Sequence, residues 1–201
     1  MPTPDKYLTI ARQGHASTRV KGSRFIGFVH AVSTKDEADL RRAELKKERH
    51  DATHQPFAFR LANGLERSSD DGEPRGTSGI SILKEIQAAD LYDVQVVIVR
   101  YFGGTKLGKG GLARAFSQCA HLTLEQAGVQ TKQNCSNLDL ILAVEQVNTA
   151  KTIAAKFGAE VASISYDLKA RISLSIGMSH YQSCREALLN RFGSSIFSDY
   201  S

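Results

Sequence analysis

The sequence has few cysteines, no tryptophan and no long apolar run, and each absence excludes a class of protein. Its 201 residues include three cysteines, Cys119, Cys135 and Cys184. They are odd in number, far apart and in neither a C-x-x-C nor a zinc-ligand spacing, so reduced thiols are expected. No segment reaches the roughly 18 apolar residues that a membrane span requires, and residues 1–15 lack a signal-type apolar core. We therefore expect a cytoplasmic protein that makes no contact with a membrane.

Positive charge exceeds negative charge by a modest amount. The chain has 26 Lys and Arg against 21 Asp and Glu, a formal charge of +5. Residues 1–130 hold 19 of the cations and 15 of the acids, and residues 131–201 hold 7 and 6. Such an excess is compatible with an acidic partner and is also common in proteins that bind nothing anionic. Any electrostatic surface of consequence is expected in the first part.

The N-terminal part begins with strand and helix patterns. Two apolar stretches, residues 7–11 and 25–32, flank a polar link and predict a pair of strands. Thr34 and Glu37 have the spacing of a capping box and predict the start of a helix. The apolar side chains that this helix offers to a core are Ala38, Leu40, Ala43 and Leu45.

A second strand and a long loop are expected next. Residues 54–61 predict a strand with Phe57 and Phe59 on one face, where aromatic side chains belong to the core more often than to a base-stacking surface. Residues 62–79 contain four glycines, a proline and a run of acids, and predict a long loop before a short helix from Ile80. Long ordered loops often carry function.

The apolar run at residues 94–99 predicts a central, buried strand. It leads through Tyr101 and Phe102 into a glycine-rich turn. Residues 112–128 then have helical periodicity and end on Gly128, a candidate C-cap. The pattern is therefore strand, glycine turn, helix.

Residues 131–201 are expected to form a separate unit. Strands are predicted over 138–144, 161–166 and 172–176, helices over 147–157 and 181–192, and a last short strand from Ile196. This order is that of the ferredoxin-like βαββαβ arrangement. The predicted fold class is α+β, with one domain over residues 1–130 and another over 131–201.

The glycine turn is the sharpest local motif. Gly103–Gly110 nearly completes the phosphate-binding pattern G-x-x-x-x-G-K-[ST], but Gly110 stands where Ser or Thr would bind magnesium. A nucleotide-hydrolysing loop is therefore not expected. The glycines could still hold an anion before a helix N-terminus, helped by Lys106, Lys109 and Arg114. Alternatively, they only let a strand turn sharply into a tightly packed helix.

The second candidate site is acidic. It consists of Asp70, Asp71 and Glu73 in the long loop, with Asp51 and His54 just before the strand. These side chains could ligate a hard cation or perform acid–base chemistry if the fold brings them together. The favoured alternative is structural, because Asp caps turns and helix starts and Glu73 could pair with Arg75 or Arg100. No metal site is assigned, and nucleophilic catalysis has no support.

Four segments together resemble the signature of the IMPACT family, in the form found in its bacterial members. They are DATH at 51–54, SDDGEPRGT at 69–77, RYFGGTKLG at 100–108 and GGLARA at 110–115. Ser78 and Ser81 stand where the family commonly has Ala and Pro, and Phe116 stands where Tyr is usual. The signature positions taken as binding candidates are Asp51, His54, Asp70, Asp71, Glu73, Thr77, Arg100, Tyr101, Gly103, Gly104, Lys106, Gly108, Lys109, Gly110, Gly111 and Arg114.

The resemblance implies a first domain similar to domain 2 of ribosomal protein S5. It implies a second domain similar to the last, ferredoxin-like domain of elongation factor G. Both likenesses point to RNA, so the resemblance predicts a regulator that binds the ribosome or RNA and modulates translation or a stress response. A protein partner from the translation machinery, without nucleic-acid binding, is an alternative.

A further alternative is an enzyme or binder acting on a phosphorylated small molecule. It requires the glycine turn and the acidic loop to face one cleft. An enzyme is the less favoured interpretation, and no cofactor is expected. The oligomeric state does not follow from the sequence.

Overall fold

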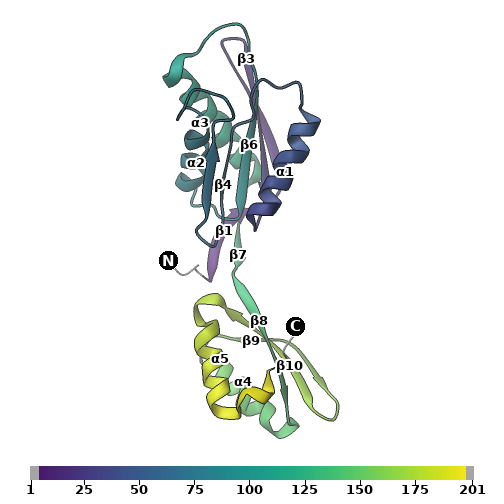
Figure 1. Ribbon diagram of the computed structural model, residues 1–201. Coiled ribbons are helices and arrows are strands. Elements are labelled where there is room, and N and C mark those ends of the chain that lie inside the picture. The colour runs from purple at the N-terminus through teal and green to yellow at the C-terminus, as the bar shows by residue number, and fades with distance from the viewer. Residues whose placement is uncertain (1–4, 198–201) are drawn as a thin grey trace. The chain divides into compact units, whose positions relative to one another are not determined.

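The computed structural model describes residues 5–197, which form two compact units (Figure 1). The first unit spans Tyr7–Lys132, and the second contains residues 5–6 and 133–197 of the described chain. Each unit combines helices with antiparallel strand pairing, so the α+β prediction is confirmed. Each also has its own buried apolar clusters.

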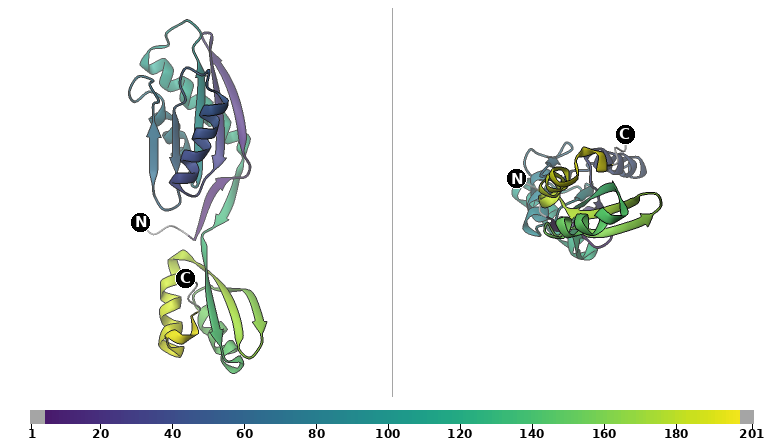
Figure 2. Two further views of the ribbon diagram at one scale, coloured as in Figure 1. Left: turned by 45° about the vertical axis from the view of Figure 1, so that its right-hand side comes forward. Right: turned by 90° about the horizontal axis from the view of Figure 1, so that it is seen from below.

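The first unit is built on a five-stranded antiparallel sheet with the order β2-β3-β6-β4-β5. Its strands are β2 (Gly14–Val20), β3 (Ser23–Ala31), β4 (Phe57–Arg60), β5 (Glu66–Ser69) and β6 (Val94–Tyr101). Helices α2 (Gly79–Ala88) and α3 (Gly108–Ala127) pack on one face, and α1 (Lys35–Glu48) packs on the other (Figures 1 and 2).

Strand β6 is the centre of this sheet, as its sequence predicts. Val96 and Ile98 face the cluster beneath α2 and α3, whereas Val97 and Val99 face the cluster beneath α1. Both faces are covered, which explains why the strand is apolar almost throughout. Phe57 and Phe59 are fully buried in the cluster beneath α1, and their assignment to the core is confirmed.

The start of α1 is confirmed in detail, but only part of its predicted core is correct. The Thr34 side chain accepts a hydrogen bond from the Glu37 amide at 3.1 Å, which caps the helix. Ala38 and Leu45 are buried, while Leu40 and Ala43 are exposed. The four positions do not share one stripe of the helix, so only two of them reach the sheet.

The strand pairing predicted at the N-terminus is wrong. The polar link between the two apolar stretches is itself strand β2, and it pairs with β3. The first apolar stretch is β1 (Lys6–Ile10), which pairs with β7 (Val129–Gln133). β2 lies at the sheet edge and alternates half-buried with exposed residues, so its hydrophobic pattern is weak.

Two further predictions of irregular structure need correction. The loop expected over 62–79 contains β5, and the polar segment after Gly128 contains β7. All five residues of β7 are exposed, which explains why the segment has no strand-like apolar period. The helix expected from residue 112 begins earlier, at Gly108, and ends as predicted with Gly128 in the left-handed region.

The second unit is a three-stranded antiparallel sheet with the order β8-β10-β9 and helices on one face. Its elements are β8 (Cys135–Leu142), α4 (Val147–Ala155), β9 (Glu160–Tyr166), β10 (Ala170–Gly177) and α5 (Met178–Phe192). The strand predicted from Ile196 is instead a 3-10 turn at Ser194–Ile196, followed by one bridge between Phe197 and Leu140. The rest of that prediction lies outside the described residues.

The cysteines are free, as expected. Cys119 and Cys184 are buried, and Cys135 is exposed. Within residues 5–197, no helix is both long enough and apolar enough to cross a membrane.

Candidate functional site

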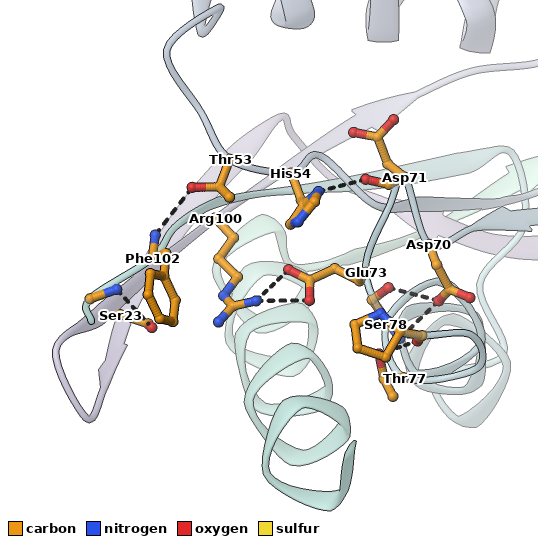
Figure 3. A network of polar contacts seen from close by, with 12 residues as sticks. Ser23, Thr53, His54, Asp70, Asp71, Glu73, Thr77, Ser78, Arg100 and Phe102 are labelled. Atoms are coloured by element: carbon orange, nitrogen blue, oxygen red, sulfur yellow. Dashed lines mark hydrogen bonds and ion pairs between the residues drawn. The ribbon is translucent and has the colours of Figure 1, made fainter. Parts of the chain in front are cut away.

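The three signature segments that were expected to carry chemistry meet in one polar network (Figure 3). The segment at 51–54 runs beside the end of β6, where the Arg100 amide donates to the His54 carbonyl at 2.9 Å. His54 Nδ1 lies 2.8 Å from the Asp71 carbonyl oxygen in the acidic loop. Arg100 reaches the same loop through Glu73. The structure therefore brings together residues that the sequence places up to fifty positions apart.

Glu73 and Arg100 form a buried ion pair. Arg100 Nη1 donates to both carboxylate oxygens of Glu73, at 2.6 and 2.8 Å. The Glu73 side chain is 1% exposed and that of Arg100 is 7% exposed. The guanidinium lies 5.6 Å from the ring centroids of Phe25 and Phe102. This pair ties the acidic loop to the central strand, and it leaves the Glu73 carboxylate out of contact with solvent.

Asp70 anchors the start of α2. Its Oδ1 accepts from the Ser78 amide, the Ser78 hydroxyl and the Gly79 amide at 2.7–3.0 Å, and its Oδ2 accepts from the Gly76 amide at 2.8 Å. Burial alone would raise the pKa of Asp70, but these four hydrogen bonds together lower it. A carboxylate held ionised in this way stabilises a helix N-terminus and is poorly suited to carry a proton.

The remaining candidates of the acidic site also have internal partners. Asp71 Oδ2 accepts from the Gln55 amide at 2.8 Å, and Asp51 accepts from the Tyr101 hydroxyl at 3.1 Å. Thr77 is buried and donates to the Pro74 carbonyl at 2.6 Å. Among residues 5–197, no group of three or more His, Cys, Asp or Glu side chains is placed to hold a metal ion. The acids of the loop therefore tie it to neighbouring elements, and Asp51 is tied to the end of β6.

The glycine turn packs against the β2–β3 turn. A Cβ atom at Gly103 would lie 1.9 Å from the carbonyl carbon of Gly22, and the Gly103 amide donates to the Ser23 hydroxyl at 3.1 Å. Gly104 and Gly108 have positive φ angles of 86° and 68°. Close packing and backbone conformation thus account for three of the motif's glycines. Gly110 and Gly111 lie in the first turn of α3 and have no positive φ angle. An added Cβ at Gly110 would be in ordinary contact with Arg114 at 3.5 Å, whereas one at Gly111 would lie 3.2 Å from the Leu107 Cβ.

The contact between the glycine turn and the β2–β3 turn brings together two segments of the chain that contain no acidic residue. Residues 6–35 lie between Asp5 and Asp36, and residues 94–124 lie between Asp93 and Glu125. Figures 1 and 2 show the β2–β3 turn and the turn before α3 at the same end of the first unit. Six exposed cations occupy these two turns and their flanks: Arg19, Lys21, Arg24, Lys106, Lys109 and Arg114. We call them the cationic end.

None of these six side chains forms an ion pair within the described residues. Their charge is therefore directed to solvent. Lys106, Lys109 and Arg114 are candidates from the glycine motif, whereas Arg19, Lys21 and Arg24 were missed. The absence of acids from both segments is the sequence signal that could have identified them.

The chain is similar in sequence to known bacterial proteins. A family model described as the Impact N-terminal domain matches residues 21–124. The IMPACT family member YvyE of Bacillus subtilis is 37% identical over 125 residues, which is 61% of this chain and 58% of that protein. An IMPACT family member of Haemophilus influenzae is 30% identical over 164 residues, 80% of this chain and 79% of that protein. YigZ of Escherichia coli is 27% identical over 164 residues, 79% of each chain.

Solved structures also resemble the chain. A crystal structure of a hypothetical protein aligns over 96% of this chain and 97% of its own, with a TM-score of 0.67 and 23% identity, which shows a shared fold. A distant match, with a TM-score of 0.38 and 26% identity, covers 60% of this chain and 47% of the two-domain translational regulator Yih1.

Proposed function

The chain belongs to the IMPACT family, and on that premise we propose that its first unit binds RNA through the cationic end as part of a role in translation. The observation that carries the proposal is the cationic end itself. Six exposed cations, none with an ion-pair partner among residues 5–197, lie on the two turns that meet at Gly22 and Gly103 and on their flanks. Clustered Lys and Arg side chains bind phosphates and release their counterions, which is the main source of affinity for nucleic acids.

The proposal includes the finer fold assignment made from the resemblance. According to this assignment, residues 1–130 form a domain similar to domain 2 of ribosomal protein S5. Residues 131–201 form a domain similar to the last, ferredoxin-like domain of elongation factor G. The separate apolar clusters on the two sides of this boundary support the division. Ribosomal RNA, or a protein bound to it, is the partner that these likenesses favour.

The enzymatic alternative has less support from the geometry. It needs an acid that is free to move a proton or bind a cation. Asp70 and Glu73 instead accept hydrogen bonds from the start of α2 and from Arg100. We therefore assign these signature residues to the scaffold that positions the glycine turn.

Co-sedimentation with bacterial ribosomes and binding to short single- and double-stranded RNA, from 50 to 200 mM salt, would test the proposal. Two variants each remove three charges from the cationic end: Lys106→Ala/Lys109→Ala/Arg114→Ala and Arg19→Ala/Lys21→Ala/Arg24→Ala. The matched control, Lys151→Ala/Lys156→Ala/Lys169→Ala, removes three exposed cations from the second unit. All three proteins have the same net charge.

We expect both test variants to bind single-stranded RNA more weakly and with a shallower salt dependence. If three phosphate contacts are lost, the slope of log affinity against log salt should fall by about 2, at ~0.7 per contact. The control should keep the wild-type slope. Absence of ribosome and RNA binding by the wild type at low salt would refute the proposal, as would an equal loss in the control.

A further inference from the structure

A hollow lies beside the cationic end, on the face of the sheet that α1 covers. Its volume is about 660 Å³, within the range of roughly 300–1,000 Å³ typical of small-molecule sites. Strand β3 contributes Arg24, Ile26 and Phe28, and the neighbouring strands contribute His15 and Tyr101. Arg49 at the end of α1 and the carboxylate of Asp51 complete the lining. Helix α1 thus leaves part of this sheet face open to a ligand.

The hollow combines flat side chains with positive charge. The rings of His15 and Phe28 are stacked, with centroids 6.2 Å apart and planes at 27°. The Arg49 guanidinium lies 5.7 Å from the Phe28 ring centroid. Phe28 is half-buried and His15 is exposed, so the stack is accessible from one side. Aromatic rings and arginine planes on an open sheet are the means by which proteins stack the bases of single-stranded RNA.

Charges for a phosphate lie at the end of the hollow nearest the β2–β3 turn. In the register of the sheet, Arg24 is opposite Tyr101 on β6 and opposite Arg19 on β2. Tyr101 donates to Asp51, and burial together with this carboxylate raises the pKa of the phenol. The phenol therefore stays protonated at neutral pH. Arg24 is also a member of the cationic end, so the hollow and that surface share this residue, and Arg19 of the cationic end lies opposite it on β2.

We propose that this hollow binds a nucleotide, with its base against Phe28 and His15 and its phosphate held by Arg24 and Arg19. The inference rests on the proposed function, because it adds a base-stacking site to a surface that otherwise contacts only phosphates. A nucleotide within an RNA strand and a free mononucleotide present the same chemistry. The strand is the source that continuity with the cationic end favours.

The test uses an eight-nucleotide RNA with the fluorescent base 2-aminopurine at its centre. A second strand has an abasic site at that position, and AMP serves as the free nucleotide. Binding is measured for the wild type, Phe28→Leu and His15→Ala across the same salt series. Tyr166→Leu, which removes an exposed aromatic side chain from the second unit, is the control. His15 is an exposed side chain, so its variant is informative even if Phe28→Leu is unstable.

The wild type should quench 2-aminopurine and bind the abasic strand about fivefold or more weakly, the effect expected for one lost stacking contact. Phe28→Leu and His15→Ala should lose the quenching and the preference for the base while keeping the wild-type salt slope. Tyr166→Leu should behave as the wild type. AMP that displaces the quenched strand, and perturbs the His15 NMR resonances, would identify a free nucleotide as an additional occupant.

Three other results have different meanings. If RNA binds with the expected salt slope, but abasic and base-containing strands bind equally and AMP leaves His15 unperturbed, the hollow is not a nucleotide site and the cationic end stands. If RNA does not bind at low salt but AMP perturbs His15, the proposed function fails and the hollow is a mononucleotide site. Failure of both strands and of AMP would overturn both proposals.

Discussion

Arg100 donates from a single nitrogen, Nη1, to both carboxylate oxygens of Glu73, although the two residues are 27 positions apart. Because both side chains are buried, removing one partner leaves an uncompensated charge in a medium of low dielectric constant. Glu73→Leu or Arg100→Met alone should therefore lower the free energy of unfolding by about 3–5 kcal/mol, measured by urea denaturation.

The double variant Glu73→Leu/Arg100→Met separates structure from function. Two apolar side chains of similar volume should recover most of the stability lost in either single variant. If the pair only holds the acidic loop, the double variant should also keep wild-type RNA binding and salt dependence. A stable double variant that no longer binds would show that the pair takes part in recognition.

Alanine substitutions in the glycine motif should differ in their effect on stability, because packing requires glycine at some positions and not at others. A methyl group at Gly103 would overlap the backbone of Gly22 and Ser23. Gly103→Ala should therefore lower the free energy of unfolding by about 3 kcal/mol or more. Gly110 is in α3, and its added Cβ would only touch Arg114 at 3.5 Å. Gly110→Ala should be neutral or stabilise by up to about 1 kcal/mol. Thermal denaturation distinguishes the two, and equal destabilisation would contradict this division.

Gly110→Ala also tests whether the turn holds an anion by close backbone approach. The variant retains all six cations of the cationic end. Weaker RNA binding by a protein of unchanged stability would show that a phosphate approaches the first turn of α3. Unchanged binding would leave the side-chain charges as the whole of the phosphate contact.

The three thiols should differ sharply in reactivity. Burial raises the pKa of Cys119 to about 11 and also raises the pKa of Cys184, whereas Cys135 is exposed. A thiol-reactive disulfide such as DTNB should modify the exposed Cys135 quickly at neutral pH. The other two should react roughly 10³-fold or more slowly, through the small unfolded population, and quickly in urea. Cys135→Ser should remove the fast phase, and a fast second thiol would show that a buried site opens in the native protein.

Local signals in the sequence predicted much of the scaffold correctly. The apolar run of β6, the Thr34 cap of α1 and the Gly128 end of α3 depend on neighbouring residues, so their patterns are visible without the fold. Strands β2 and β7 were missed because they lack such a local pattern. β2 and β7 are held by pairing with distant strands, and their solvent-facing residues are polar.

The candidate site shows the same limit. The residue types in the acidic loop favoured structural roles, but the choice between Arg75 and Arg100 as partner of Glu73 depends on which strand end lies beside the loop. The cationic end required the three hairpin cations and the glycine turn to meet at Gly22 and Gly103, a contact between residues 81 positions apart in the sequence. Pattern and spacing carry no information about such a contact.

Asp70 should make the stability of the first unit sensitive to acid. Its pKa is lower in the folded protein than the usual value of 3.8, because hydrogen bonds from Gly76, Ser78 and Gly79 outweigh the effect of burial. A depressed carboxyl pKa contributes stability that is fully present above 3.8 and is lost as pH falls through the folded value. Asp70→Ala should therefore cost about 0.5–2 kcal/mol at neutral pH, the usual effect of losing an N-cap.

The difference between wild type and Asp70→Ala should shrink as pH falls below 3.8, because the wild-type carboxyl is then progressively protonated. Ser78→Ala, which removes one of the four hydrogen bonds, should give a smaller loss with the same pH dependence. Urea unfolding monitored by circular dichroism between pH 2.5 and pH 7 would measure both effects. A difference that stays constant over this range would mean that the neutral carboxyl caps α2 as well as the carboxylate does.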